Sequence, residues 1–116
     1  MGHLSTHVLD TMHGKPAAGV RIDLYSLGKE RRQVKSLLTN DDGRGDEAML
    51  SEEEIKKGEW ELVFHIGEYF ASLNVKASDV PFLNQVPVRF GIDDPANHYH
   101  VPLLASPWSY TTYRGS

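Results

Sequence analysis

Residues 59–66 read Glu59-Trp60-Glu61-Leu62-Val63-Phe64-His65-Ile66, with a large apolar side chain at every second position from Trp60 onward. Successive side chains of an extended strand point to opposite faces, so this period of two predicts a β-strand with one buried face. The pattern recurs in Val20-Arg21-Ile22-Asp23-Leu24-Tyr25 and in Val86-Pro87-Val88-Arg89-Phe90-Gly91-Ile92. Strands with one apolar face each predict sheets that pack face to face around a core.

The rest of the chain adds short strands and little helix. Further strands are predicted at 4–10, 33–39, 99–105 and 110–114, with turn residues between them at 13–16, 40–43 and 93–95. Ser51-Glu52-Glu53-Glu54 has the pattern of a helix capping box with Gly58 as its stop, and 68–73 can form another short helix. No strand–helix–strand spacing favours a parallel sheet. We therefore expect a single domain over residues 1–116, all-β, with an antiparallel β-sandwich of about seven strands.

The composition restricts the classes of function. Of the 116 residues, 40% are hydrophobic and 24% are charged, which is ordinary for one folded domain. Twelve Lys and Arg against sixteen Asp and Glu give a net charge of −4, so we expect no nucleic-acid partner. Cysteine is absent, which excludes disulfides, thiolate metal sites and a cysteine nucleophile. No apolar stretch reaches the ~20 residues of a membrane span and no signal-peptide pattern is present, so we expect a cytoplasmic protein without a membrane partner.

Histidines are the first candidate reactive side chains. His98 and His100 lie two positions apart in a predicted strand and therefore share a face. His7 lies on the strand face opposite Leu4 and Val8, which predicts that it points away from the core, toward solvent or a partner subunit. A strand histidine is more often a solvated or structural residue than a reactive one, and the pattern alone leaves both interpretations open.

Arg44 is the second candidate, directly after the turn Asp41-Asp42-Gly43. An arginine here is ordinarily solvated, although its rigid guanidinium would also suit a planar anionic or carbonyl-rich ligand. His7, His98 and His100 could alternatively form a zinc site with water, but a nearby Arg44 would repel a dication, so we expect no metal and no cofactor. The chain lacks G-x-S-x-G, G-x-x-x-x-G-K-[ST] and G-x-G-x-x-G patterns, which excludes an α/β-hydrolase and the usual nucleotide cradles.

Several motifs occur in order along nearly the whole chain. They are Leu4-Ser5-Thr6-His7-Val8-Leu9-Asp10, Gly14-Lys15-Pro16-Ala17, Asp42-Gly43-Arg44, His98-Tyr99-His100-Val101-Pro102-Leu103-Leu104 and Tyr113-Arg114-Gly115-Ser116. Together they resemble the transthyretin-like proteins, and the last motif resembles the 5-hydroxyisourate hydrolase branch of that family. The resemblance implies a prealbumin-type β-sandwich of eight strands with one short helix. It also implies a homotetramer, a dimer of dimers, with active sites in a channel between the dimers.

The resemblance further implies an activity and a set of site residues. This branch hydrolyses 5-hydroxyisourate, an oxidised purine formed from urate, to 2-oxo-4-hydroxy-4-carboxy-5-ureidoimidazoline without a metal. Carried over motif by motif, the catalytic residues are His7, Arg44, His100 and Ser116. The residues expected to bind or surround the substrate are His98, Tyr113, Arg114 and Gly115. The alternative function on the same fold is a small-molecule carrier without turnover, which would line its channel with apolar and lysine side chains.

Overall fold

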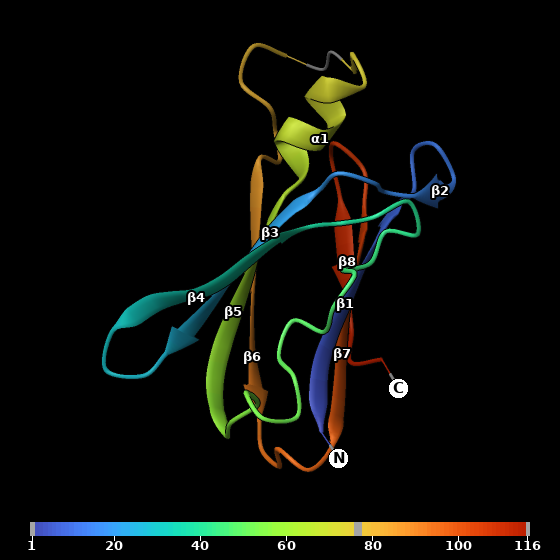
Figure 1. Cartoon of the computed structure of the whole chain (residues 1–116). Helices are drawn as coiled ribbons and strands as arrows, with labels where there is room; N and C mark the ends of the chain where they lie inside the picture. The colour runs from blue at the N-terminus through green and yellow to red at the C-terminus, as the bar shows by residue number, and fades with distance from the viewer. Residues whose placement is uncertain (1, 76–77, 116) are drawn as a thin grey trace.

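The computed structural model describes residues 2–75 and 78–115, and their strands form two facing sheets (Figure 1). One sheet has the order β2-β1-β7-β8, formed by Lys15–Pro16, His3–Asp10, His98–Ala105 and Tyr110–Thr112. The other has the order β4-β3-β5-β6, formed by Arg31–Leu38, Arg21–Leu27, Gly58–His65 and Gln85–Ile92. Helix α1 (Ile66–Ser72) follows β5 at one end of the sheets. The predicted eight-stranded β-sandwich with a short helix is confirmed.

The core lies between the sheets and uses the alternating faces that the sequence predicts. Fully buried side chains include Leu4, Val8, Ile22, Leu24, Leu62, Phe64, Val86 and Leu103. Burying one such side chain contributes about 1.5–3 kcal/mol, so a register slip that turned this face outward would cost the fold heavily. The core therefore decides which side chains of each strand point outward.

One strand pair departs from the predicted antiparallel arrangement. β1 and β7 run parallel, with His3 opposite His98 and Ser5 opposite His100. Among the described residues the other five strand pairs are antiparallel. Parallel neighbours need a long crossover, and here the whole second sheet with α1 supplies it, rather than the single helix of a strand–helix–strand unit. This parallel register decides which side chains meet on the outer face of the first sheet.

The helical turns expected after Ser51 reduce to a single turn. The backbone N–H groups of Glu54 and Ile55 both donate to Ser51 O at 3.0 Å, and Ser51 N–H donates to Glu54 Oε1 at 2.9 Å. One half of the capping box, the bond from Ser51 N–H to the Glu54 side chain, is thus formed. Ile55 then turns into the core, and Gly58 begins β5 with a φ of 143°. The other helix, expected at 68–73, is α1 and begins at Ile66.

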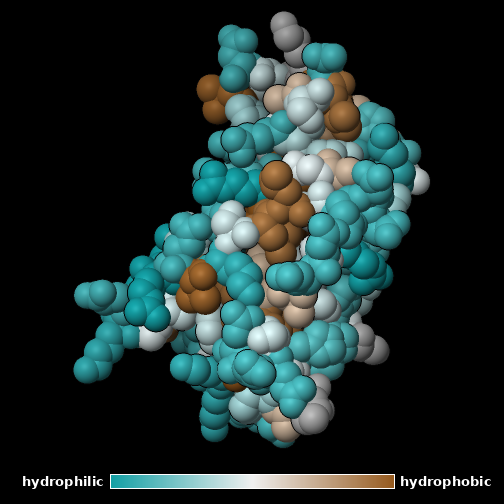
Figure 2. Space-filling model, in the orientation of Figure 1, coloured by the Kyte–Doolittle hydropathy of each residue, from teal (hydrophilic) through white to brown (hydrophobic). Residues whose placement is uncertain are grey.

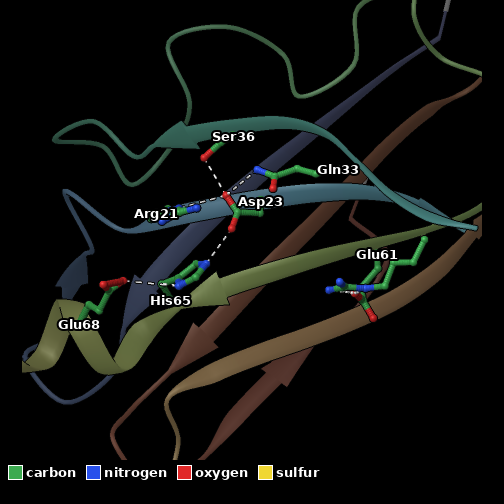
Figure 3. A network of polar contacts seen from close by, with 8 residues as sticks. Arg21, Asp23, Gln33, Ser36, Glu61, His65 and Glu68 are labelled. Carbon is green, nitrogen blue, oxygen red and sulfur yellow. Dashed lines mark hydrogen bonds and ion pairs between the residues drawn. The ribbon is translucent and has the colours of Figure 1, made fainter.

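The outer face of the β4-β3-β5-β6 sheet buries charged side chains, an arrangement that alternation alone did not predict (Figure 3). Asp23, Glu61 and His65 are 2%, 3% and 8% exposed. Asp23 Oδ2 lies 2.8 Å from His65 Nε2, and Glu61 lies between arginines of β4 and β6 at 2.7 and 2.9 Å. Long basic side chains cover the carboxylates, so a polar face becomes a paired and largely dry network.

The surface seen in the orientation of Figure 1 is mostly hydrophilic, with hydrophobic patches near its centre and toward the α1 end (Figure 2). The segment that follows α1 exposes Leu73, Val80 and Phe82. Within residues 2–75 and 78–115, no helix has the length and hydrophobicity needed to cross a membrane.

Candidate active site

The outward face of β1 and β7 gathers four histidines around one serine. His3, Ser5 and His7 project from β1 because the residues between them are buried, and His98 and His100 project from β7 in the same way. Ser5 Oγ lies 3.0 Å from His98 Nε2 and 2.8 Å from His100 Nδ1. The ring centroids of His7 and His100 are 6.3 Å apart. The predictions that His7 points away from the core and that His98 and His100 share a face are confirmed.

Gly43 brings Arg44 to this face. Its φ of 77° lies in the left-handed region, and a Cβ on it would collide with Val8 O. Val8 N–H donates to Gly43 O at 2.8 Å, and Arg44 forms an isolated bridge with His7. Glycine is therefore required where the loop crosses β1, and the exposed Arg44 side chain follows directly beside the histidines. His3, Ser5 and Arg44 help to line a shallow depression of about 200 Å³.

Burial and positive charge lower the pKa values of the two inner histidines. For His7, burial lowers the pKa and the Arg44 charge adds to the effect, outweighing an opposing contact with Asp42. For His100, burial again acts first, followed by the charges of Arg44, His7 and His98. Both rings are therefore neutral near pH 7, and a neutral imidazole has a lone pair that can accept a proton from water.

Gly115 packs directly on the ring of His100. Its backbone N–H donates to His100 O at 2.7 Å, and an ideal Cβ on Gly115 would lie 2.6 Å from His100 Cδ2. No side chain larger than hydrogen fits here without displacing the ring. The structure thus brings Gly115 to His7, Arg44, His98 and His100.

Tyr113 and Arg114 lie elsewhere in the single chain. The Arg114 guanidinium stacks over the Tyr99 ring at 4.1 Å and donates to His98 O at 3.3 Å. Both residues line a cavity of about 180 Å³ at the edge of the sandwich, which β6 residues such as Phe90 also line. In one copy of the chain these side chains therefore lie along this cavity and apart from His7 and His100, although the Arg114 charge is close enough to act on His98. Ser116, the remaining predicted site residue, lies outside the described residues.

Two residues of this face were missed by the sequence reasoning. Ser5 bridges two histidines, and the His3 ring stacks on His98 with a centroid distance of 3.9 Å. The available signal was the alternation of β1 itself, which places positions 3, 5 and 7 on one face. In the described part of the chain, no three His, Asp or Glu side chains are arranged to share a metal ion.

Comparison with known proteins identifies the family of the chain. Residues 4–115 match the family model described as HIUase/Transthyretin family. The chain belongs to this family. A protein named 5-hydroxyisourate hydrolase 2 from Rhizobium meliloti (strain 1021) is 53% identical over 116 residues, covering 99% of this chain and 97% of that protein.

Solved structures in the family share the sandwich. The structure of a Klebsiella pneumoniae 5-hydroxyisourate hydrolase is 33% identical, with a TM-score of 0.83 and all of both chains covered. The crystal structure of an (S)-allantoin synthase is 49% identical with a TM-score of 0.93, covering 99% of this chain but 44% of that longer one. The resemblance that the sequence motifs indicated, and the fold that it implied, are confirmed.

Proposed function

We propose that the chain hydrolyses 5-hydroxyisourate to 2-oxo-4-hydroxy-4-carboxy-5-ureidoimidazoline in urate degradation. The observation that carries the proposal is the convergence of His7, Arg44 and His100 on one outward face, with both histidines neutral near pH 7. The name of the Rhizobium relative, at 53% identity over nearly the full length, supports the same substrate.

The histidines have the chemistry that opening an acyl C–N bond of this substrate requires. Water must lose a proton as it attacks, and the departing nitrogen must gain one. His7 and His100 share these two tasks, with their depressed pKa values keeping the proton-accepting form populated. General acid–base catalysis of this kind is typically worth about 10²–10⁴-fold in rate.

Arg44 binds the anionic, carbonyl-rich substrate and stabilises the oxyanion that forms at the attacked carbonyl. Its guanidinium is always charged and presents several donors in a fixed plane. The same charge lowers the pKa of both histidines, so one residue serves the substrate and the base. In the proposal His98 and Gly115 flank the substrate, and Ser116 orients the water or a histidine on the strength of the sequence resemblance.

The proposal includes a homotetramer, a dimer of dimers, located in the cytoplasm. Each sheet has two edge strands, and β6 and β8 are the edges on one side of the sandwich. Unpaired strand edges favour pairing with another copy. The cavity that Tyr113 and Arg114 line lies between these edges, so the two residues would lie close to such a contact. A second dimer facing the histidines would convert the shallow depression into a channel, which Tyr113 and Arg114 then help to shape. Light scattering coupled to size-exclusion chromatography measures the assembly.

The carrier alternative has less support. A site for a hydrophobic hormone would present apolar and lysine side chains on the outer face of β1 and β7. The described residues of that face are apolar at one end, at Leu9, Pro102 and Leu104, but at the other end histidines, a serine and an arginine gather without a lysine.

The test is the ultraviolet decay of 5-hydroxyisourate generated in place by a uricase. Wild type is expected to accelerate the decay above the spontaneous rate, whereas His100→Ala and Arg44→Ala lose at least about 10²-fold in turnover. A wild type that decays substrate no faster than buffer would contradict the proposal and favour the carrier. Near-normal turnover by either variant, with its assembly intact, would contradict the assignment of that residue.

A further inference from the structure

Ser5 contacts two histidines of this face at once. Its Oγ is 3.0 Å from His98 Nε2 and 2.8 Å from His100 Nδ1, both within hydrogen-bonding distance. The parallel pairing of β1 and β7 places Ser5 opposite His100 and two residues along β1 from His3, which lies opposite His98. The serine is half-buried, and both rings are held by their own strand, so the bridge belongs to the fold rather than to a mobile surface.

A serine hydroxyl has one proton and two lone pairs, and this restricts the protonation of both rings. When Ser5 donates to one ring nitrogen, it can only accept from the other. One of the two facing nitrogens therefore carries a hydrogen and the other does not. Because His98 faces Ser5 with Nε2 and His100 faces it with Nδ1, this condition puts both neutral rings in the same tautomer.

We propose that Ser5 is a positioning residue that selects the Nδ1–H tautomer of His100 and passes protons between His100 and His98. The inference rests on the proposed function and adds a residue and a route for the proton to it. In this tautomer His100 Nδ1–H donates to Ser5 Oγ, Ser5 Oγ–H donates to His98 Nε2, and the lone pair of His100 Nε2 is free to act on water.

The proton transfer balances without any further reactant. His100 Nε2 takes a proton from the attacking water, and the oxygen bonds to the carbonyl carbon. His100 then gives its Nδ1 proton to Ser5 Oγ while Ser5 gives its own proton to His98 Nε2. His100 is again neutral, His98 carries the charge, and Ser5 is chemically unchanged. His100 then gives its Nε2 proton to the departing nitrogen as the C–N bond breaks, while Ser5 returns a proton to His100 Nδ1 and takes one from His98 Nε2. Both rings are again neutral Nδ1–H tautomers, which resets the relay.

The groups around the two rings favour a proton that is passed on rather than retained. His98 faces His3 on β1 and Arg114 beyond β8, and His100 faces His7 on β1 and Arg44 in the adjoining loop. Positive charge from the arginines disfavours an imidazolium at either ring, so a proton taken from water is not retained. A relay to the second ring then prevents the base from being held in its charged form.

The experiment compares Ser5→Ala and Ser5→Thr with Ser36→Ala, a matched serine control on the opposite sheet whose hydroxyl binds Asp23. Nitrogen-15 NMR of the histidine rings, without substrate, reports the tautomer of each ring across a pH titration. We expect His98 and His100 of wild type to carry their hydrogen on Nδ1 and to titrate as a coupled pair. Ser5→Ala uncouples them and releases His100 from that tautomer, and Ser5→Thr keeps the wild-type pattern.

Kinetics supply the second measurement. Ser5→Ala should lower kcat by about 10-fold or more with KM little changed, because the base survives but its proton route does not. Ser5→Thr restores most of kcat, and Ser36→Ala stays at the wild-type value.

Different results would contradict the Ser5 bridge and the proposed hydrolase function. Wild-type rings that differ in tautomer, or a Ser5→Ala protein with unchanged tautomers and kcat, would overturn the bridge. A wild type with the expected tautomers but no hydrolysis would overturn the proposed function, and the catalytic use of the bridge with it.

Discussion

Replacing Gly115 by alanine tests whether the position of the His100 ring limits the reaction. The added Cβ would lie 2.6 Å from His100 Cδ2, whereas ordinary contact begins at 3.4 Å. The ring must therefore retreat by about 0.8 Å, the difference between these distances. A misplacement of about 1 Å in a catalytic group can cost about 10²-fold in rate, and the same movement strains the 2.8 Å contact with Ser5.

We expect Gly115→Ala to lower kcat by about 10²-fold while its melting temperature stays close to that of wild type. The decay assay with a uricase measures turnover, and Gly28→Ala is the matched control because no atom lies within 4 Å of its added Cβ. If Gly115→Ala keeps activity within about threefold of wild type, the backbone at 115 has moved instead of the ring. That result would refute the inference that alanine at 115 displaces the His100 ring.

Three further predictions concern pH and metal. Burial and Arg44 lower the pKa values of His7 and His100, so kcat/KM should fall only as pH drops below 6.5. Arg44→Ala should move this fall, in its residual activity, to higher pH. Burial alone would raise the pKa of Asp23, but hydrogen bonds from Ser36 and its other partners outweigh burial and lower it from 3.8. The stability that this carboxylate adds is therefore present above pH 3.8 and is lost as pH falls through its lower folded value. Urea unfolding should show a larger loss of stability on acidification in wild type than in Asp23→Ala, which starts about 3–5 kcal/mol less stable at pH 7. Dialysis against EDTA should leave the hydrolysis rate unchanged; activity that disappears and returns with zinc would contradict the metal-free mechanism.

The face on which each candidate side chain lies was predictable because it follows from local geometry. In an extended strand, position 7 must face away from positions 4 and 8, and positions 98 and 100 must share a face, whatever the rest of the chain does. The order of motifs added Arg44 and Gly115 to the histidines through family resemblance.

The contacts between these side chains could not be predicted from local sequence. Ser5 and His98 are 93 positions apart, and they meet only because β1 pairs with β7 in parallel and in one particular register. No local pattern distinguishes this pairing from an antiparallel one, since either would bury the same apolar faces. For the same reason the motif at 113–115 predicted three neighbours, whereas the fold separates Arg114, stacked on Tyr99, from Gly115 at the histidines.

The buried charged side chains also show which features the sequence predicts and which depend on strand pairing (Figure 3). Alternation correctly placed Glu61 and His65 on the face of β5 opposite Leu62, where a polar residue is ordinarily solvated. Neighbouring strands cover both side chains with arginines and a carboxylate, leaving Glu61 only 3% exposed. The sequence by itself determined the strands, their inner and outer faces and the residue types available for chemistry, because these depend on nearest neighbours. Tertiary structure alone decided which outer side chains touch and how far water reaches them, because that depends on pairing between distant strands.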